Sequence, residues 1–254
     1  MSAWTPCPES CLSLFAGDSL RTHWQRLHLG DSEPWPTNSA LQDGWRLYHE
    51  GDFGTAADLG LSLGVDGLAL ACKATCMHAT YVEPRDSVRF PRLQTVTQWT
   101  GRRLEAAPDD PTAWYWQGYA LGRYSQGISV SRALAMGLGR RVREALENAH
   151  RIAPTHVDAH LALARFHAET IDQVGELIGG MLHGARRDQG EALYDAALAL
   201  APQSLIVLSE AAEGLLMLGG DAAQPRVAAL QSQARALEPL DAMEKLYLQA
   251  AAAS

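Results

Sequence analysis

Residues 111–126, with the sequence PTAWYWQGYALGRYSQ, decide the fold of this chain. Within them a large residue is followed by a small residue four positions later and by a second large residue three positions after that. The spacing recurs in three copies, which are Trp114, Gly118 and Leu121; His160, Ala164 and His167; and Leu208, Ala212 and Leu215. Because residues three and four apart share one face of a helix, each copy predicts a helix with one small, close-packing position.

Each copy follows a proline that ends an Ala-rich phrase. These prolines are Pro108, Pro154 and Pro202, and Pro239 ends a fourth phrase. The combination resembles the tetratricopeptide pattern, in which pairs of helices repeat along the chain. A single pair cannot bury its apolar face, so neighbouring pairs must stack. An earlier copy of the pattern begins at Gly44.

The composition excludes a β-rich fold. The chain has 254 residues, of which 47% are hydrophobic, and alanine and leucine far outnumber valine and isoleucine. Alanine and leucine favour helices, whereas β-branched residues favour strands. We therefore expect an all-α protein, a tetratricopeptide-like right-handed α-solenoid of about 4–5 helix pairs. Residues 1–38 are expected to form an N-terminal arm packed on the body, residues 39–238 the solenoid, and residues 239–254 a C-terminal capping helix.

Two insertions make the repeats longer than the ~34 residues of a standard tetratricopeptide unit. They cover residues 123–139 and 172–184, and each falls between the two helices of a pair. Both contain helix-capable stretches and several glycines. Such insertions lie on one rim of a solenoid, and the sequence leaves open whether they close its groove.

Charge and hydropathy restrict the partners and the location. The formal net charge is −8, which is a poor match for a phosphate backbone, so we expect no nucleic-acid binding. No stretch approaches 18 consecutive apolar residues, so we expect no membrane span. The first 17 residues carry no lysine or arginine, which disfavours a signal peptide and favours a cytoplasmic protein.

The sequence contains no convincing catalytic motif. A Gly-rich phosphate loop, a nucleophile elbow and a paired-histidine zinc motif are all absent. Cys72 and Cys76 lie one helical turn apart and are interpreted as small core residues. His156 and His160 form the best metal-like pair, but zinc needs three or four ligands, and we interpret these side chains as structural. We expect no enzyme, no cofactor and no metal; a stoichiometric metal at this pair would revive the enzyme hypothesis.

The first helix of each pair lines the concave face of such a solenoid. By register, the residues expected to contact a partner there are Tyr115, Tyr119, Arg123, Arg165, Glu169 and Trp45. His49, Glu213 and Met217 are expected on the same face. Aromatic and arginine side chains are the usual hot-spot residues of protein interfaces. The alternative is that the tyrosines simply pack against an insertion or the N-terminal arm.

Residues 113–237 resemble two related families. The similar stretches are 116–126, 137–154, 159–169 and 191–202. They are similar to the regulator of microtubule dynamics family and to the T-component of TRAP transporters. The resemblance implies a helical-repeat fold with long insertions and a role in binding other proteins. The TRAP likeness implies an accessory role in solute uptake.

Two functions remain open on the sequence alone. The first is a non-enzymatic adaptor that holds a partner protein or peptide, with self-association as a further possibility. Capture of a C-terminal carboxylate is not supported, since neither Lys73 nor Lys245 lies on the expected lining. The second is a small-molecule or lipid-binding accessory protein whose insertions close the groove. An open groove lined by Tyr, Arg and Glu favours the first function, and a closed apolar cavity favours the second.

Overall fold

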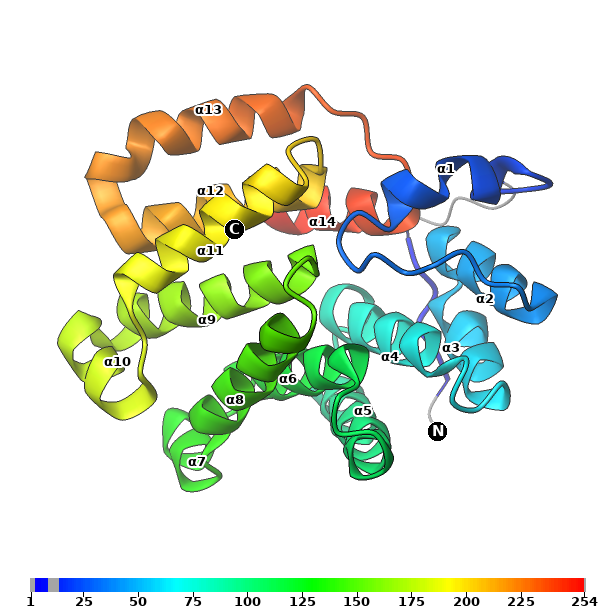
Figure 1. Ribbon diagram of the computed structural model, residues 1–254, viewed down its shortest axis with the longest axis horizontal. Helices are drawn as coiled ribbons and strands as arrows, with labels where there is room; N and C mark the ends of the chain where they lie inside the picture. The colour runs from blue at the N-terminus through cyan, green and yellow to red at the C-terminus, as the bar shows by residue number, and fades with distance from the viewer. Residues whose placement is uncertain (1–2, 9–13, 254) are drawn as a thin grey trace.

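The computed structural model describes residues 3–8 and 14–253, and within them every regular element is helical (Figure 1). The elements are α1 (Ser19–Leu27), α2 (Ser39–His49), α3 (Phe53–Ser62), α4 (Leu68–Met77), the π-helical turn η1 (His78–Val82), α5 (Asp86–Ala106), α6 (Pro111–Gln126), α7 (Val130–Ala135), α8 (Leu138–Ile152), α9 (Val157–Val174), α10 (Glu176–His183), α11 (Arg187–Leu200), α12 (Leu205–Gly219), the 3-10 turn η2 (Gly220–Ala223), α13 (Gln224–Arg235) and α14 (Ala242–Ala253). The predicted all-α fold class is confirmed.

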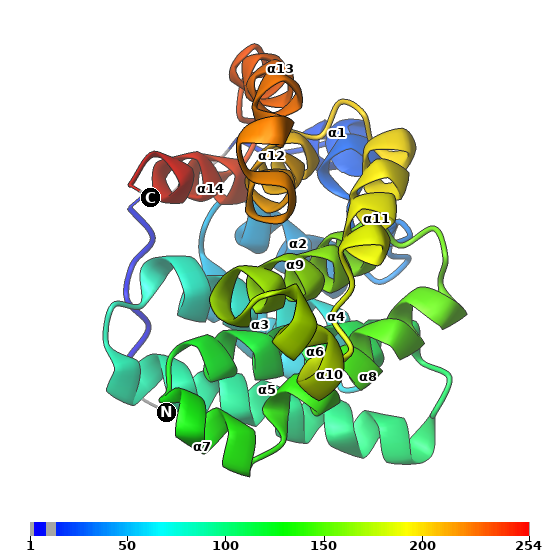
Figure 2. The same cartoon turned by 90° about the vertical axis from the view of Figure 1, so that its left-hand side faces the viewer.

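The helices stack in successive pairs, which curve around a common inner side (Figures 1 and 2). The pairs are α2 with α3, α4 with α5, α6 with α8, α9 with α11, and α12 with α13. The first helices of successive pairs also contact one another, from α2 to α4, α4 to α6, α6 to α9 and α9 to α12. The inner wall is therefore built from first helices, with the second helices outside them.

Capping residues set where many helices begin. Asn38, Asp52, Asp110 and Ser204 each accept a hydrogen bond from a backbone N–H in the first turn of the following helix. Each bond satisfies one of the donors that a helix start leaves unpaired. Asp18 precedes α1, but its side chain makes no capping bond because its backbone is already helical.

Small residues hold the helix pairs close together. A side-chain carbon added at Gly118 in α6 would lie 2.8 Å from Cγ of Leu146 in α8. A larger residue would force the Leu146 side chain, or the helix that carries it, to move. The small position in the repeat spacing is therefore the point at which α6 and α8 cross.

Both chain ends contribute to the main apolar core. Phe15 and Trp24, from the segment that precedes α2, are buried in the same cluster as Trp45. Met243 and Leu246 from α14 belong to this cluster too. A second cluster is formed by α9, α11, α12 and α13. Of the predicted arm and capping segment, residues 1–2, 9–13 and 254 lie outside the described residues.

The two insertions form short helices with exposed apolar side chains. In α10, Leu177 and Met181 are 77% and 79% exposed, and in α7 Val130 is 70% exposed. The two helices lie on the same side of the molecule (Figure 2). They leave apolar surface in contact with solvent, which is unusual for a core-forming element.

No helix among the described residues has the length and apolar character needed to span a bilayer.

Four buried histidines make stability depend on pH. Burial lowers the pKa of His28, His78, His156 and His167 to about 4, from an ordinary value near 6.5. Unfolding exposes these rings and restores their affinity for protons. The unfolded state therefore binds more protons than the native state between about pH 6.5 and pH 4. Two carboxyl groups act in the opposite direction, because burial raises the pKa of Asp158 to about 6 and that of Glu33 to about 7.

We expect the free energy of unfolding to fall as the pH is lowered from about 6.5 toward 4. Urea unfolding followed by circular dichroism at about pH 7 and pH 5 measures this. His156 caps α9 by accepting a hydrogen bond from the Ala159 N–H, a role that asparagine also fills. His156→Asn should therefore keep the cap and give a flatter pH profile. An unfolding midpoint that is equal at the two pH values would contradict the expectation.

Candidate functional site

A cavity of about 800 Å³ occupies the inner side of the solenoid. Its wall combines the first helices α2, α4, α6, α9 and α12 with residues from α1, α7, α8, α10 and α14. Most of the lining is apolar or aromatic, and it includes Tyr81, Phe166 and Tyr247. A cavity of this size matches the ~300–1,000 Å³ of small-molecule sites.

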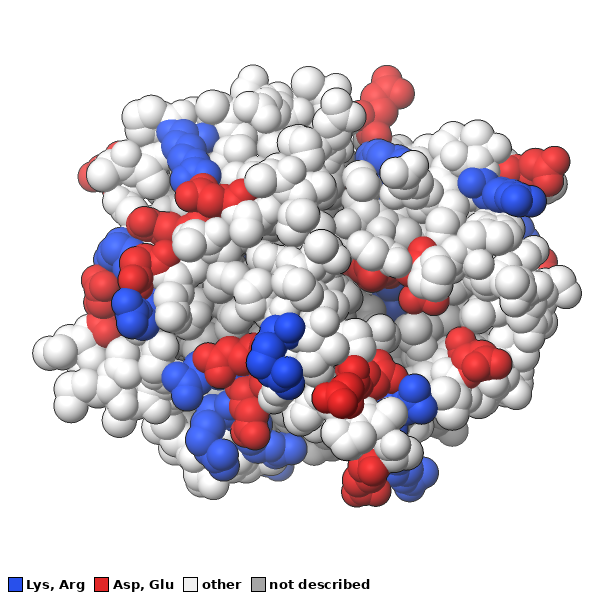
Figure 3. All heavy atoms as spheres, in the orientation of Figure 1, with Lys and Arg blue, Asp and Glu red and all other residues white. Residues whose placement is uncertain are grey.

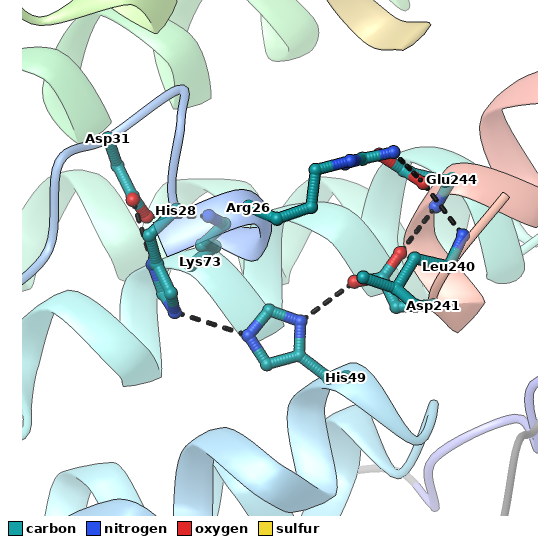
Figure 4. A network of polar contacts seen from close by, with 8 residues as sticks. All are labelled: Arg26, His28, Asp31, His49, Lys73, Leu240, Asp241 and Glu244. Atoms are coloured by element: carbon teal, nitrogen blue, oxygen red, sulfur yellow. Dashed lines mark hydrogen bonds and ion pairs between the residues drawn. The ribbon is translucent and has the colours of Figure 1, made fainter. Parts of the chain in front are cut away.

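The two ends of the chain meet at this wall (Figure 4). The Arg26 guanidinium, at the end of α1, pairs through both of its terminal nitrogens with the Glu244 carboxylate of α14. Glu244 also accepts a hydrogen bond from the Leu240 N–H at 2.8 Å. Next to this pair, the His49 Nδ1–H donates to Asp241 at 2.7 Å. The chain's own ends thus form part of the cavity wall.

The His49–Asp241 contact continues into a buried polar chain (Figure 4). His49 Nε2 lies 3.2 Å from His28 Nε2, and the other ring nitrogen of His28 lies 2.8 Å from Asp31. Asp31 also accepts a hydrogen bond from Lys73 Nζ at 2.6 Å. Burial alone would raise the pKa of Asp31, but His28 and Lys73 hold it well below its usual value. The ionised carboxylate therefore fixes Lys73 on the wall.

An ion-pair cluster lies farther along the cavity, on α9 and α12. Arg165 donates to Glu169 at 2.7 Å, to Glu210 at 3.1 Å and to Glu213 at 2.8 Å. Glu169 in turn accepts a hydrogen bond from Gln126 of α6 at 2.8 Å. The guanidinium is engaged by three carboxylates, so it has little capacity left for a ligand.

Tyr119 and Arg123 stand beside this cluster on α6. The Arg123 guanidinium packs over the Tyr119 ring, 5.2 Å from its centre, and donates to the side chain of Gln126. The Tyr119 hydroxyl donates to Thr80 at 3.3 Å. These contacts hold both side chains against the wall. Tyr115, one turn earlier, is only 5% exposed.

The structure brings most of the residues expected on the concave face to one cavity. Those that line it are Tyr115, Tyr119, Arg123, Arg165, Glu169 and His49. Glu213 and Met217 do not line the cavity, although Glu213 forms an ion pair with the lining residue Arg165. The expectation that Trp45 contacts a partner is wrong, because its side chain is 1% exposed and does not line the cavity. Trp24 of α1 packs edge-on against its ring and covers it.

Sequence reasoning missed several lining residues, among them Tyr48, Lys73 and Asp158, and the expectation that Lys73 lies off the lining was wrong. The side chain of Asp158 lies against Gly30, where any side chain would collide with the carboxylate. Repeat register could have placed Tyr48 and Lys73 on the inner helices α2 and α4. No local pattern, in contrast, pairs residue 30 with residue 158.

The histidines and cysteines singled out in the sequence have structural surroundings. Cys72 and Cys76 are fully buried in the core, and burial raises the pKa of both thiols. His160 Nδ1 in α9 donates to the carbonyl of His156, the residue that caps this helix. His78 accepts a hydrogen bond from Arg92 and donates to the Thr5 carbonyl. Across the described residues, no three metal-ligating side chains converge.

The face shown in Figure 3 carries acidic and basic side chains in small mixed clusters. No broad patch of one sign covers it. Electrostatic attraction to a nucleic-acid backbone needs such a basic surface. This face offers none.

Comparison with solved structures places the fold. The chain is similar to the crystal structure of a thermophilic TPR protein from Thermus thermophilus, with a TM-score of 0.59 and 19% sequence identity. The match covers 85% of this chain and 98% of that one. The fold is tetratricopeptide-like. At this level of identity the likeness concerns the fold alone. Comparisons with family models and with curated proteins find no match.

Proposed function

We propose that this tetratricopeptide-like protein is a non-enzymatic binding protein that holds a small, largely apolar molecule inside its solenoid. The observation that carries the proposal is a concave face that the chain's own ends cover in part. Residues of α1 and α14 form part of the cavity wall and are joined there by the Arg26–Glu244 pair. Repeat solenoids ordinarily present an open concave surface to an extended partner. Here that surface forms a half-open cavity of about 800 Å³.

The lining also supports this proposal over an open protein-binding groove. Arg165 and Glu169, which we expected to meet a partner, are already paired with each other. The remaining wall is rich in aromatic and aliphatic side chains, as in sites that bury most of a small ligand.

A protein-binding adaptor is the second candidate, and the exposed surface of α7 and α10 favours it. In α10 the exposed apolar residues are Leu177, Ile178, Met181 and Leu182. Surfaces of this kind mark interaction sites in many soluble proteins. A partner that docks here would contact the rim formed by the insertions, at the edge of the cavity.

The test is a titration with N-phenyl-1-naphthylamine, a neutral apolar fluorophore that brightens when it leaves water. We expect saturable binding with one site per chain. Ala162 lines the cavity, one helical turn beyond Asp158 on α9. Ala162→Phe should fill the space and weaken binding about tenfold or more, which corresponds to about 1.4 kcal/mol.

Ala199→Phe provides the matched control, since Ala199 is an exposed residue of α11 outside the cavity lining. It should bind the probe as the wild type does. Equal binding by both variants would contradict the cavity as the site. If the probe binds at the rim of α7 and α10 instead, Leu177→Ser and Met181→Ser will remove binding while Ala162→Phe does not.

A further inference from the structure

Four side chains form a continuous line of polar contacts where the two ends of the chain meet (Figure 4). Asp31 lies 2.8 Å from His28 Nδ1, and Asp241 lies 2.7 Å from His49 Nδ1. Between the two rings, His28 Nε2 lies 3.2 Å from His49 Nε2. Both rings are buried, with exposed fractions of 3% and 1%. The line therefore joins the segment after α1 to α2 and to the start of α14, without access to water at its centre.

This line needs one more hydrogen than neutral histidines supply. Each of its three contacts requires one hydrogen between the two heavy atoms, and a neutral imidazole carries a single N–H. Burial alone would raise the pKa of Asp31 and Asp241, but contacts with His28 and His49 lower it, so both carboxylates are ionised and bring no hydrogen. With two hydrogens, one contact would set two lone pairs against each other, whichever tautomers the rings adopt.

The count of charges gives the same answer. Lys73 Nζ donates to the second oxygen of Asp31 at 2.6 Å, and both side chains are largely buried. Together with the line, this group holds one ammonium and two carboxylates. Two neutral rings would leave it with a net negative charge, whereas one additional proton makes it neutral. A buried charge without a partner is unfavourable, so the protonated state is preferred.

The surrounding titratable groups do not supply the missing positive charge. Those that interact with members of the line are Arg26, Glu244, Glu33, Asp158, His156, Tyr48 and Tyr115. Arg26 and Glu244 pair with each other and add no net charge. Ionisation of the other two carboxyl groups adds negative charge, which favours the extra proton. Near pH 7 the remaining three groups are neutral, because burial raises the pKa of the phenols and lowers that of the imidazole to about 4.

We propose that His49 is a buried imidazolium at neutral pH and that its extra proton holds the start of α14 on the cavity wall. His49 donates Nδ1–H to Asp241 and Nε2–H to the neutral ring of His28, which donates its own Nδ1–H to Asp31. Asp241 also accepts a hydrogen bond from the Glu244 N–H in the first turn of α14, at 2.8 Å. Loss of the proton at higher pH breaks the line at its centre. The contact is thus a pH-sensitive latch between the two ends of the chain.

The direct test is long-range 1H–15N NMR of the histidine rings in 15N-labelled protein. At about pH 7.5 a free imidazole is about nine-tenths neutral. An imidazolium shows two protonated ring nitrogens, and a neutral ring shows one of each kind; His49→Gln identifies the signals of residue 49. We expect both nitrogens of His49 to be protonated at this pH. A neutral His49 would overturn the inference, and so would a stoichiometric metal ion between the two Nε2 atoms, detected by elemental analysis.

Asp241→Asn removes the need for the extra proton and keeps the shape of the side chain. The asparagine oxygen can accept from the Glu244 N–H, and its NH₂ group can donate to His49 Nδ1. All three contacts then have a hydrogen with neutral rings, and the charges balance. We expect His49 to become neutral in this variant, with its hydrogen on Nε2. A doubly protonated His49 in Asp241→Asn would show that the proton does not depend on the line, and would overturn the inference.

Thermal unfolding at about pH 7 and pH 9 tests the latch. A free imidazole loses its proton near pH 6.5, so a proton that the folded protein keeps above this pH contributes stability that declines as the pH rises. We expect the wild-type Tm to fall between the two pH values by at least about 3 °C more than that of Asp241→Asn. An equal fall in both proteins would overturn the latch.

Asp43→Asn is the matched control, because Asp43 lies on α2 as His49 does and its side chain is 66% exposed. This variant should keep the doubly protonated His49 and the wild-type dependence of Tm on pH. The inference goes beyond the proposed function, and neither measurement uses a ligand. Absence of probe binding would therefore contradict the proposed function alone, and a neutral His49 would contradict the latch alone.

Discussion

Gly67→Ala should lower the free energy of unfolding by about 3 kcal/mol, at the upper end of the usual cost of overpacking. A side-chain carbon at Gly67 would lie 2.1 Å from the Gly60 carbonyl oxygen, and one at Gly60 would lie 2.7 Å from the Gly67 carbonyl oxygen. The backbones of α3 and α4 touch at this crossing. Because the colliding atoms are backbone and not the end of a flexible side chain, the two helices would have to separate.

Gly101→Ala is the matched control for this prediction. Gly101 lies inside α5, and a side-chain carbon there would meet nothing within 4 Å. Alanine is the better helix former, so this variant should gain about 0.5–1 kcal/mol. Urea unfolding of both variants measures the difference. A Gly67→Ala protein within about 0.5 kcal/mol of the wild type would show that the crossing is looser than the structure has it.

Arg26→Met should cost about 2 kcal/mol, because it strands the buried Glu244 carboxylate at the junction of the chain ends. The Glu244 side chain is 7% exposed, whereas Arg26 is 31% exposed, which places the cost below that of a fully buried pair. Arg26→Met combined with Glu244→Gln should recover part of the loss. Glutamine is uncharged, and its side-chain oxygen can still accept the hydrogen bond from Leu240.

Arg226→Met serves as the control for the junction, since Arg226 pairs with Asp195 at the surface and both side chains are about half exposed. Exposed pairs contribute little, so we expect a change below about 0.5 kcal/mol. The junction account fails if Arg26→Met costs no more than Arg226→Met, or if the double variant is no more stable than the single one.

Local sequence patterns indicate where helices begin, but they do not show that the two ends of the chain meet at the cavity wall. Asp110 followed by Pro111, and Ser204 ahead of an apolar run, are helix-start signals, and α6 and α12 begin directly after Asp110 and Ser204. Both depend on hydrogen bonds within one turn, which are visible in a few consecutive residues. The contact between Arg26 and Glu244 joins residues far apart in the chain, and no repeat spacing encodes it.

Repeat register gave the direction of side chains but not what covers them. Tyr115 and Arg123 face the inner side, as the spacing along α6 predicts. Trp45 lies one helical turn before His49 on α2, and by register it should share the same face. Trp24 of α1 packs against the Trp45 ring and separates it from the cavity. The positions of Lys73 and Asp158 as cavity residues likewise depend on how distant segments pack.

The central claim is that a small apolar molecule binds inside the solenoid. The most direct test is the ratio of the dissociation constants for N-phenyl-1-naphthylamine in Ala162→Phe and Ala199→Phe. The two substitutions are chemically identical and differ only in whether the added ring enters the cavity. We predict a ratio of about ten or more, with one binding site per chain in the control. A ratio near one, or binding that does not saturate, would contradict the claim.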